Sequence, residues 1–135
     1  MGRDLAGSPT GLGGARFVGF VPVRDLATSR DFYVETLGLA LVEESPFAVV
    51  IDGGGTQVRL TQVPDHQPQP FTVAGWDVDD IRAVIGVLAS SGVRFLRFDH
   101  FDQDDLGIWH TPGGDRVAWF ADPDGNTLSL TEAAR

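Results

Sequence analysis

The stretch Arg116–Thr131, RVAWFADPDGNTLSLT, contains two strand-like segments separated by a turn. The first segment is apolar, and in the second Leu128 and Leu130 alternate with polar residues, which is the period of a half-buried strand. Between the segments, Pro123 fixes its own φ and Gly125 permits a positive φ, so the chain can reverse there. The stretch therefore predicts a β-hairpin with one face against a core.

An earlier segment repeats this pattern. Residues 52–62, DGGGTQVRLTQ, align without gaps with residues 122–132, DPDGNTLSLTE, so that the Asp, the Gly and the Leu-Thr pair coincide. Farther upstream, VRDL at 23–26 resembles VDDI at 78–81, and each leads through a helical segment to a glycine. The chain is therefore predicted to contain two copies of one β-α-β-β-β unit.

Each copy has its own predicted elements. In the first copy, we expect a helix capped by Asp25 and ended by Gly38, and strands at residues 17–23, 40–44, 47–51 and 56–62. In the second copy, Asp79 or Asp80 caps a helix ended by Gly92, with strands at 71–78 and 93–98, a short extended piece at 106–111, and the final hairpin. The predicted domains are a flexible tail at 1–14, modules at 15–63 and 71–135, and a proline-rich linker at 64–70.

Composition restricts the class of protein. Ten Lys and Arg residues against nineteen Asp and Glu give a net charge of −9, which argues against nucleic acid as a partner. No run of about 18 apolar residues predicts a membrane span. Cysteine is absent, which excludes disulfides and fits a cytoplasmic location.

The chain resembles the vicinal oxygen chelate superfamily, the glyoxalase/bleomycin-resistance/dioxygenase group. The resemblance covers residues 15–132 and depends on these motifs: VRDL at 23–26, FY at 32–33, LGL at 37–39, AWFADPDGN at 118–126 and LSL at 128–130. It implies an α+β fold in which two βαβββ modules form a curved mixed sheet of about eight strands around a concave groove. It also implies a homodimer.

The resemblance further implies four metal-ligand positions, on the first and fourth strands of each module. Those positions are Val18, Arg59, Val73 and Ser129. Valine cannot ligate, arginine repels a cation, and a lone serine is a poor ligand. We therefore expect no metal and no other cofactor in the groove.

If Val18 faces the groove, strand alternation places Phe20 there as well, opposite the fourth strand with Gln57 and Arg59. Apolar walls with few polar anchors suit a planar or carboxylate-bearing organic molecule. Arg59 is an anion anchor, part of an internal ion pair, or a surface residue. The predicted ligand-binding residues are Val18, Phe20, Gln57, Arg59, Val73, Trp109, His110 and Ser129.

Trp109 and His110 lie on a loop that could cover the groove. His110 is the candidate catalytic residue, as a lid residue or general base, and its alternative is a solvated loop histidine. His100 is a weaker candidate. Trp119 is expected to pack in the core. The acidic segment 99–105 lacks the spacing of a calcium loop and is expected to be a solvated loop.

Three functions follow. The first is a metal-independent protein that binds a small molecule for resistance or sequestration. The second is an enzyme on the same scaffold, a lyase, isomerase or dioxygenase-like protein, that uses protein acid/base groups. The third is a metalloenzyme with ligands elsewhere, among His100, His110 and the aspartates. Fold resemblance does not decide among them.

Overall fold

The computed structural model describes residues 11–135. Most of the predicted tail, 1–14, falls outside the described residues. The first module contains these elements: β1 (Val18–Val23), α2 (Leu26–Arg30), the π-helix η1 (Asp31–Thr36), β2 (Ala40–Glu44), β3 (Ala48–Asp52) and β4 (Gln57–Gln62). The second contains β5 (Thr72–Asp77), α3 (Ile81–Ser90), β6 (Trp109–His110), β7 (Arg116–Ala121) and β8 (Thr127–Glu132). The predicted α+β fold of two βαβββ modules is confirmed.

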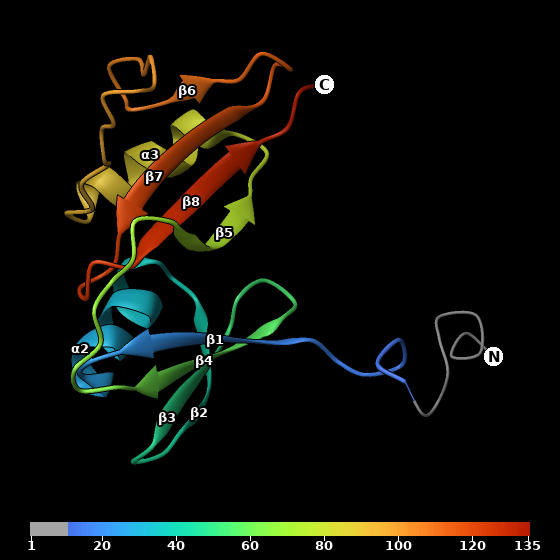
Figure 1. Cartoon of the computed structure of the whole chain (residues 1–135), viewed down its shortest axis with the longest axis vertical. Coiled ribbons are helices and arrows are strands. Elements are labelled where there is room, and N and C mark those ends of the chain that lie inside the picture. The colour runs from blue at the N-terminus through green and yellow to red at the C-terminus, as the bar shows by residue number, and fades with distance from the viewer. Residues whose placement is uncertain (1–10) are drawn as a thin grey trace.

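The eight strands form two four-stranded mixed sheets, with orders β1-β4-β3-β2 and β5-β8-β7-β6. In each sheet the first strand pairs in parallel with the fourth, and the remaining pairs are antiparallel. The two sheets therefore have the same topology, as the repeat predicts. Each sheet forms its own ladder instead of joining the other in one continuous sheet (Figure 1).

The helices begin and end as the sequence indicates. Asp25 accepts a hydrogen bond from the Ala27 N–H, and Asp80 accepts one from the Ala83 N–H. The cap of α3 is thus Asp80 and not Asp79. Gly38 and Gly92 follow the helical segments with φ of 79° and 93°, values that glycine adopts without a steric penalty.

One predicted strand, 93–98, is not a strand. It pairs with the sheet only through an isolated bridge between Phe95 and Phe120. The Gln103 side chain takes the place of a strand partner, because it accepts from the Phe98 N–H and donates to the Leu96 carbonyl. Because these backbone groups already have hydrogen-bond partners, they do not require a neighbouring strand.

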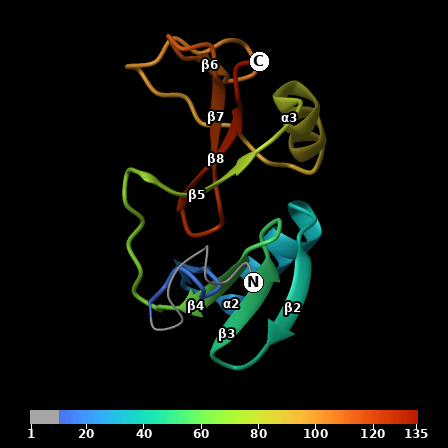
Figure 2. The same cartoon turned by 90° about the vertical axis from the view of Figure 1, so that its right-hand side faces the viewer.

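The two modules share one hydrophobic core. Buried side chains from both modules belong to one cluster, which includes Val23, Tyr33, Leu60, Ile85 and Phe120. Figures 1 and 2 show α3 on one side of the second sheet and the loop that leads to β6 on the other. Each sheet thus buries the face on the helix side, and its opposite face has no helix over it.

The turn at 122–126 fastens the second module to the first. Asp122 is buried, and its carboxylate accepts from the Tyr33 hydroxyl at 2.8 Å and from the Asn126 side-chain amide at 2.9 Å. Burial, followed by the charge of Asp122 and this hydrogen bond, raises the pKa of Tyr33. Tyr33 is therefore held as a neutral donor.

Two further contacts continue this junction. The buried Asp124 accepts from the Arg24 backbone N–H and the Arg24 Nε, at 3.0 and 3.1 Å. The Asn126 amide nitrogen donates to both the Pro22 carbonyl and Asp122, so its oxygen is the acceptor facing His66 Nε2 at 2.7 Å. His66 belongs to the linker segment, and its Nε2 is therefore the protonated nitrogen in this contact.

Candidate ligand-binding site

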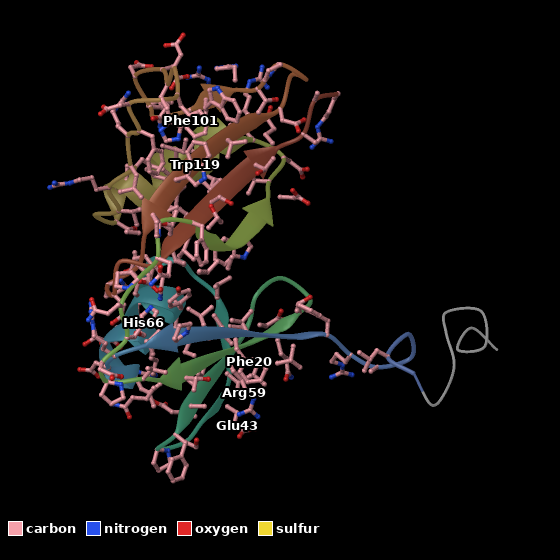
Figure 3. The ribbon with its side chains drawn as sticks, viewed as in Figure 1. Phe20, Glu43, Arg59, His66, Phe101 and Trp119 are labelled. Carbon is pink, nitrogen blue, oxygen red and sulfur yellow. The ribbon has the colours of Figure 1, made fainter. Side chains whose placement is uncertain are left out.

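One row of side chains crosses the open face of the first sheet. The strand register places Phe20 on β1 beside Arg59 on β4, Arg59 beside Val50 on β3, and Val50 beside Glu43 on β2. Figure 3 shows Phe20, Arg59 and Glu43 following one another across this sheet. Arg59 is exposed, and no ion pair within residues 11–135 engages it. The internal ion pair considered from the sequence is not formed within these residues.

The corresponding row of the second sheet differs. Gly75 on β5 takes the place of Phe20, and it pairs with Ser129 on β8, which pairs with Trp119 on β7. A Cβ placed on Gly75 would lie 2.3 Å from the Ser129 hydroxyl oxygen, closer than real Cβ contacts allow. Ser129 thus occupies the space above a glycine, and the second face is recessed where the first carries a phenylalanine.

The residues at the four family metal positions do not fit a cation. Val18 shares the face of Phe20. Val73 lies at a register irregularity of β5 and is 38% exposed. Neither valine has a donor atom, and Arg59 carries a positive charge. No other group of three or more potential His, Cys, Asp or Glu ligands forms within residues 11–135, including around His100 and His110.

The predicted groove residues are only partly brought together. Val18, Phe20 and Val73 line one hollow of about 550 Å³ between β1 and β5. Gln57 instead lines a separate shallow hollow with Arg16 and Asp52, so it does not share a pocket with the other three. The remaining predicted ligand residues, Arg59, Trp109, His110 and Ser129, lie outside both hollows.

A more distinctive pocket lies on the open face of the second sheet. Its volume is about 370 Å³, and its lining is mostly aromatic: Pro70, Phe71, Thr72, Phe98, His100, Phe101, Trp119 and Thr127. The Phe101 ring lies parallel to Trp119, with 5.1 Å between centroids and 5° between planes. Trp109 packs beside both rings, with its centroid 4.4 Å from that of Phe101 and 6.2 Å from that of Trp119. Figure 3 shows Phe101 and Trp119 together over this sheet.

We call this site the aromatic pocket. Its aromatic residues were largely missed from the sequence, where Trp119 was expected in the core. Trp119 is half-buried and belongs to the open face, because its neighbours Ala118 and Phe120 point into the core. Phe98 and Phe101 come from an acidic, irregular loop whose aromatic spacing follows neither helix nor strand. No periodic signal could have placed them above the sheet.

His110 lies on β6, with its Nε2 3.6 Å from Asp104 Oδ2. Burial alone would raise the pKa of the Asp104 carboxyl. The Ile108 and Leu106 N–H groups, with Arg82 and His110, outweigh burial and lower that pKa below its usual range. Asp104 is therefore a turn-stabilising carboxylate, whereas Asp99, Asp102 and Asp105 are exposed, as in the predicted solvated loop.

The topology and the open, partly aromatic faces define a class: two-module βαβββ proteins of the glyoxalase and bleomycin-resistance fold. The chain belongs to the Glyoxalase/Bleomycin resistance protein/Dioxygenase superfamily, whose sequence model matches residues 15–130. This assignment confirms the resemblance inferred from the motifs.

Solved structures agree with the family. TnmS3, an antibiotic binding protein from Streptomyces sp. CB03234, is 28% identical, with 88% of this chain and 95% of that chain covered and a TM-score of 0.67. A superfamily member from Sphaerobacter thermophilus DSM 20745 is also 28% identical, with 87% and 97% covered and a TM-score of 0.65. A bleomycin-binding protein complexed with bleomycin, at 21% identity, 88% and 98% coverage and a TM-score of 0.69, supports the fold alone.

No curated protein matches the chain in sequence. Among the helices of residues 11–135, none combines the length and the apolar composition needed to cross a lipid bilayer.

Proposed function

We propose that this protein binds a small organic molecule with a planar aromatic part, without a metal, in a resistance or sequestration role. The observation that carries the proposal is the aromatic pocket, in which Phe101 stacks on Trp119 beside an empty volume of about 370 Å³. Stacked aromatic contacts contribute about 0.5–1.5 kcal/mol each beyond the area that they bury. The lining supplies aromatic rings for such contacts from Phe71, Phe98, Phe101 and Trp119.

The comparison with TnmS3 supports this direction, because that protein is described as binding an antibiotic and shares 28% identity over nearly its whole length. Two of the four metal-ligand positions that the family resemblance indicates, Val18 and Val73, support metal independence, because valine has no atom that can bind a metal ion. The lack of cysteine is consistent with a cytoplasmic location, which we retain as part of the proposal.

We further propose a homodimer. Several large apolar side chains are exposed on the sheet faces and their borders, including Phe17, Phe20 and Phe71 at 60–76% exposure. Phe17 and Phe20 border one hollow and Phe71 borders the aromatic pocket, so both modules carry exposed apolar side chains of the kind found at interaction surfaces. Association of the first sheet of one copy with the second sheet of another would cover both faces. It would also bring Arg59 toward an aromatic pocket as an anion anchor.

The ligand proposal is tested with naphthoate as a planar anion and naphthalene methanol as its neutral analogue, in titrations followed by calorimetry. We expect Trp119→Ala to weaken binding of both compounds at least tenfold, because the stacking surface is lost. Phe47→Ala is the matched control, since it removes an aromatic ring that is 80% exposed on the first module and outside the aromatic pocket. Equal binding by the wild-type protein and Trp119→Ala would refute the site.

The anion anchor is tested separately. Arg59→Ala should weaken naphthoate at least tenfold and leave naphthalene methanol unchanged, because only the carboxylate needs the guanidinium. If Arg59→Ala affects both compounds equally, or neither, the anchor assignment is wrong.

The dimer is tested by sedimentation velocity. Phe20→Asp should shift the protein toward monomer, because it places a charge on the proposed interface. Val87→Asp, which alters an exposed valine on the outer face of α3, should leave the oligomeric state unchanged. If the wild-type protein sediments as a monomer at a protein concentration 100-fold above the Kd measured for the ligand, the dimer is removed from the proposal.

A second candidate function is an acid/base enzyme on this scaffold. The observation that favours it is the contact of His110 with Asp104, next to Trp109 at the edge of the aromatic cluster. A histidine oriented by a carboxylate can act as a general base. Turnover of a bound compound that is lost in His110→Ala, with binding retained, would support this function, and binding without turnover would favour the first.

A further inference from the structure

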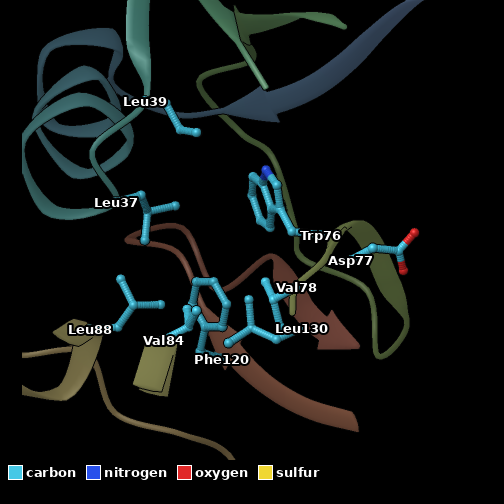
Figure 4. A pocket seen from close by; sticks show the side chains of 9 residues that line it. All are labelled: Leu37, Leu39, Trp76, Asp77, Val78, Val84, Leu88, Phe120 and Leu130. Carbon is cyan, nitrogen blue, oxygen red and sulfur yellow. The ribbon is translucent and has the colours of Figure 1, made fainter. Parts of the chain in front are cut away.

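A second cavity lies where the two modules meet, on the helix side of the sheets and away from the aromatic pocket. Its volume is about 190 Å³. The first module contributes two leucines from the segment after η1, and the second contributes residues from β5, α3, β7 and β8. Figure 4 shows the lining: Leu37, Leu39, Trp76, Asp77, Val78, Val84, Leu88, Phe120 and Leu130.

The cavity presents mostly apolar surface. Leu37, Leu39, Trp76, Val78 and Val84 pack against the core but remain partly uncovered, and all five border this one cavity. The Trp76 indole N–H already donates to the Gly53 carbonyl at 2.9 Å, so the ring offers only its apolar surface. The Asp77 carboxylate points away from the lining in Figure 4, as strand alternation with Trp76 requires.

The cavity is a cleft at the module junction and not an enclosed void, because it is partly open to solvent. Water therefore contacts its apolar side chains, and a ligand that covers them removes that surface from water. For scale, an enclosed apolar cavity of about 150 Å³ takes up benzene. A cleft of about 190 Å³ has room for one slightly larger ring.

We propose that this cavity is a second ligand site, which takes one compact neutral apolar molecule of the size of a single substituted benzene ring. The occupant contacts the leucines of the first module and α3 of the second, so its binding stabilises the junction between the modules. A charged molecule gains no partner here, because the charged residue of the lining, Asp77, directs its carboxylate away from the cavity.

The site is independent of the proposed function. Trp119 and Phe120 are neighbours on β7, and alternation sends Trp119 to the aromatic pocket and Phe120 to this cavity. A ligand of one site therefore does not touch the side chains that line the other.

The experiment is a toluene titration of the full chain followed by ¹H–¹⁵N and methyl NMR. We expect saturable shifts at the Trp76 indole N–H and at the methyl groups of Leu37, Leu39 and Val84, with the Trp119 indole unchanged. Saturating toluene should also raise the melting temperature by several degrees.

Val84→Phe should fill the cavity and weaken toluene binding at least tenfold. The matched control is Val87→Phe on the same helix, which adds the same atoms to an exposed position and should bind toluene as the wild type does. Trp119→Ala should also retain toluene binding, even where it abolishes binding of naphthoate. Shifts that do not saturate, shifts centred on Trp119, or unchanged binding in Val84→Phe would each overturn the proposal.

Discussion

The turns at 52–56 and 122–126 descend from the same sequence pattern and have the same local chemistry. In each, an aspartate carboxylate accepts backbone hydrogen bonds from residues further along the turn: Asp52 from Gly54 and Gly55, and Asp122 from Asp124 and Asn126. Their surroundings differ. Asp52 is exposed, whereas Asp122 is 5% exposed and packs against the first module.

This difference follows from the residues between the aspartate and the strand. Asp124 and Asn126 carry side chains that reach Arg24 and the Pro22 carbonyl, while the first turn has glycine at the position of Asp124 and the shorter Thr56 at the position of Asn126. The hydrogen bond from the first turn to the second module comes from its backbone, where the Gly53 carbonyl accepts from Trp76. A duplicated motif can thus keep its local role in both copies and acquire a tertiary role in only one.

Asp122→Ala should cause the largest loss. It leaves the Tyr33 hydroxyl, the Asn126 amide and two backbone N–H groups without their acceptor. Buried unpaired groups cost about 1–3 kcal/mol each, so we expect about 4 kcal/mol less stability in urea unfolding. The matched change in the exposed turn, Asp52→Ala, should cost less than about 1 kcal/mol. Similar losses for the two variants would contradict the difference in burial.

Glycine at the fourth turn position gives the next largest contrast. Gly55 and Gly125 both have positive φ, at 103° and 86°. A Cβ on Gly55 meets nothing within 4 Å, whereas on Gly125 it would lie 3.1 Å from Pro68 of the linker. Gly55→Ala should therefore cost about 1 kcal/mol from backbone strain alone, and Gly125→Ala about 2–3 kcal/mol. Chemical denaturation of both variants measures the difference, and a larger cost at Gly55 would oppose it.

Alkaline pH should act on the buried turn alone. Tyr33 is the single tyrosine, and the chain has no lysine or cysteine, so it is the one side chain expected to titrate between pH 9 and 12. Burial and Asp122 raise its pKa in the folded state, whereas the unfolded chain ionises near pH 10. The unfolded state therefore binds fewer protons above pH 10, and stability falls there by about 1.4 kcal/mol per pH unit.

The measurement is urea unfolding at pH 9, 10 and 11.5, with tyrosinate absorbance as a second signal. From pH 10 to 11.5 we expect a loss of about 2 kcal/mol in the wild-type protein. Tyr33→Phe should be less stable at pH 9 but should lose almost nothing more at high pH. A parallel loss in Tyr33→Phe would show that another group is responsible.

The smallest effect concerns the contact from the first turn to the second module. Trp76→Phe keeps a ring against Phe120 but removes the N–H that donates to Gly53. One such hydrogen bond contributes about 1 kcal/mol, so the loss should be of that order and well below that of Asp122→Ala. Thermal unfolding of the two variants ranks them, and a reversed order would mean that the first turn is the more important junction.

Much of the fold could be predicted from sequence because its signals are local. The helix caps Asp25 and Asp80, the glycines that end the helical segments, and the alternation in β8 each depend on neighbouring residues. A strand was wrongly predicted at 93–98, where backbone groups bond instead to the Gln103 side chain, whose role is visible only after the loop has folded back. The sequence narrowed the N-terminal cap of α3 to Asp79 or Asp80, but it could not decide between the two.

The candidate site was less predictable. Strand alternation could predict which side of its strand each of Phe20, Arg59 and Ser129 occupies, because residues two positions apart in a strand point to the same side. It could not show that Gln57 lines a different hollow from Phe20, or that Phe101 lies flat on Trp119. Those arrangements depend on how two sheets and a long irregular loop meet.

The sequence by itself determined a duplicated unit, its turns and caps, and the lack of strong metal ligands at the four positions that the family resemblance indicates, because these are properties of residue type and spacing. Only the tertiary structure decided that one of two similar turns is buried, that the aromatic residues of an acidic loop cover a sheet, and that an apolar space remains between the modules. Those outcomes depend on contacts between residues far apart in the chain, to which local patterns do not refer.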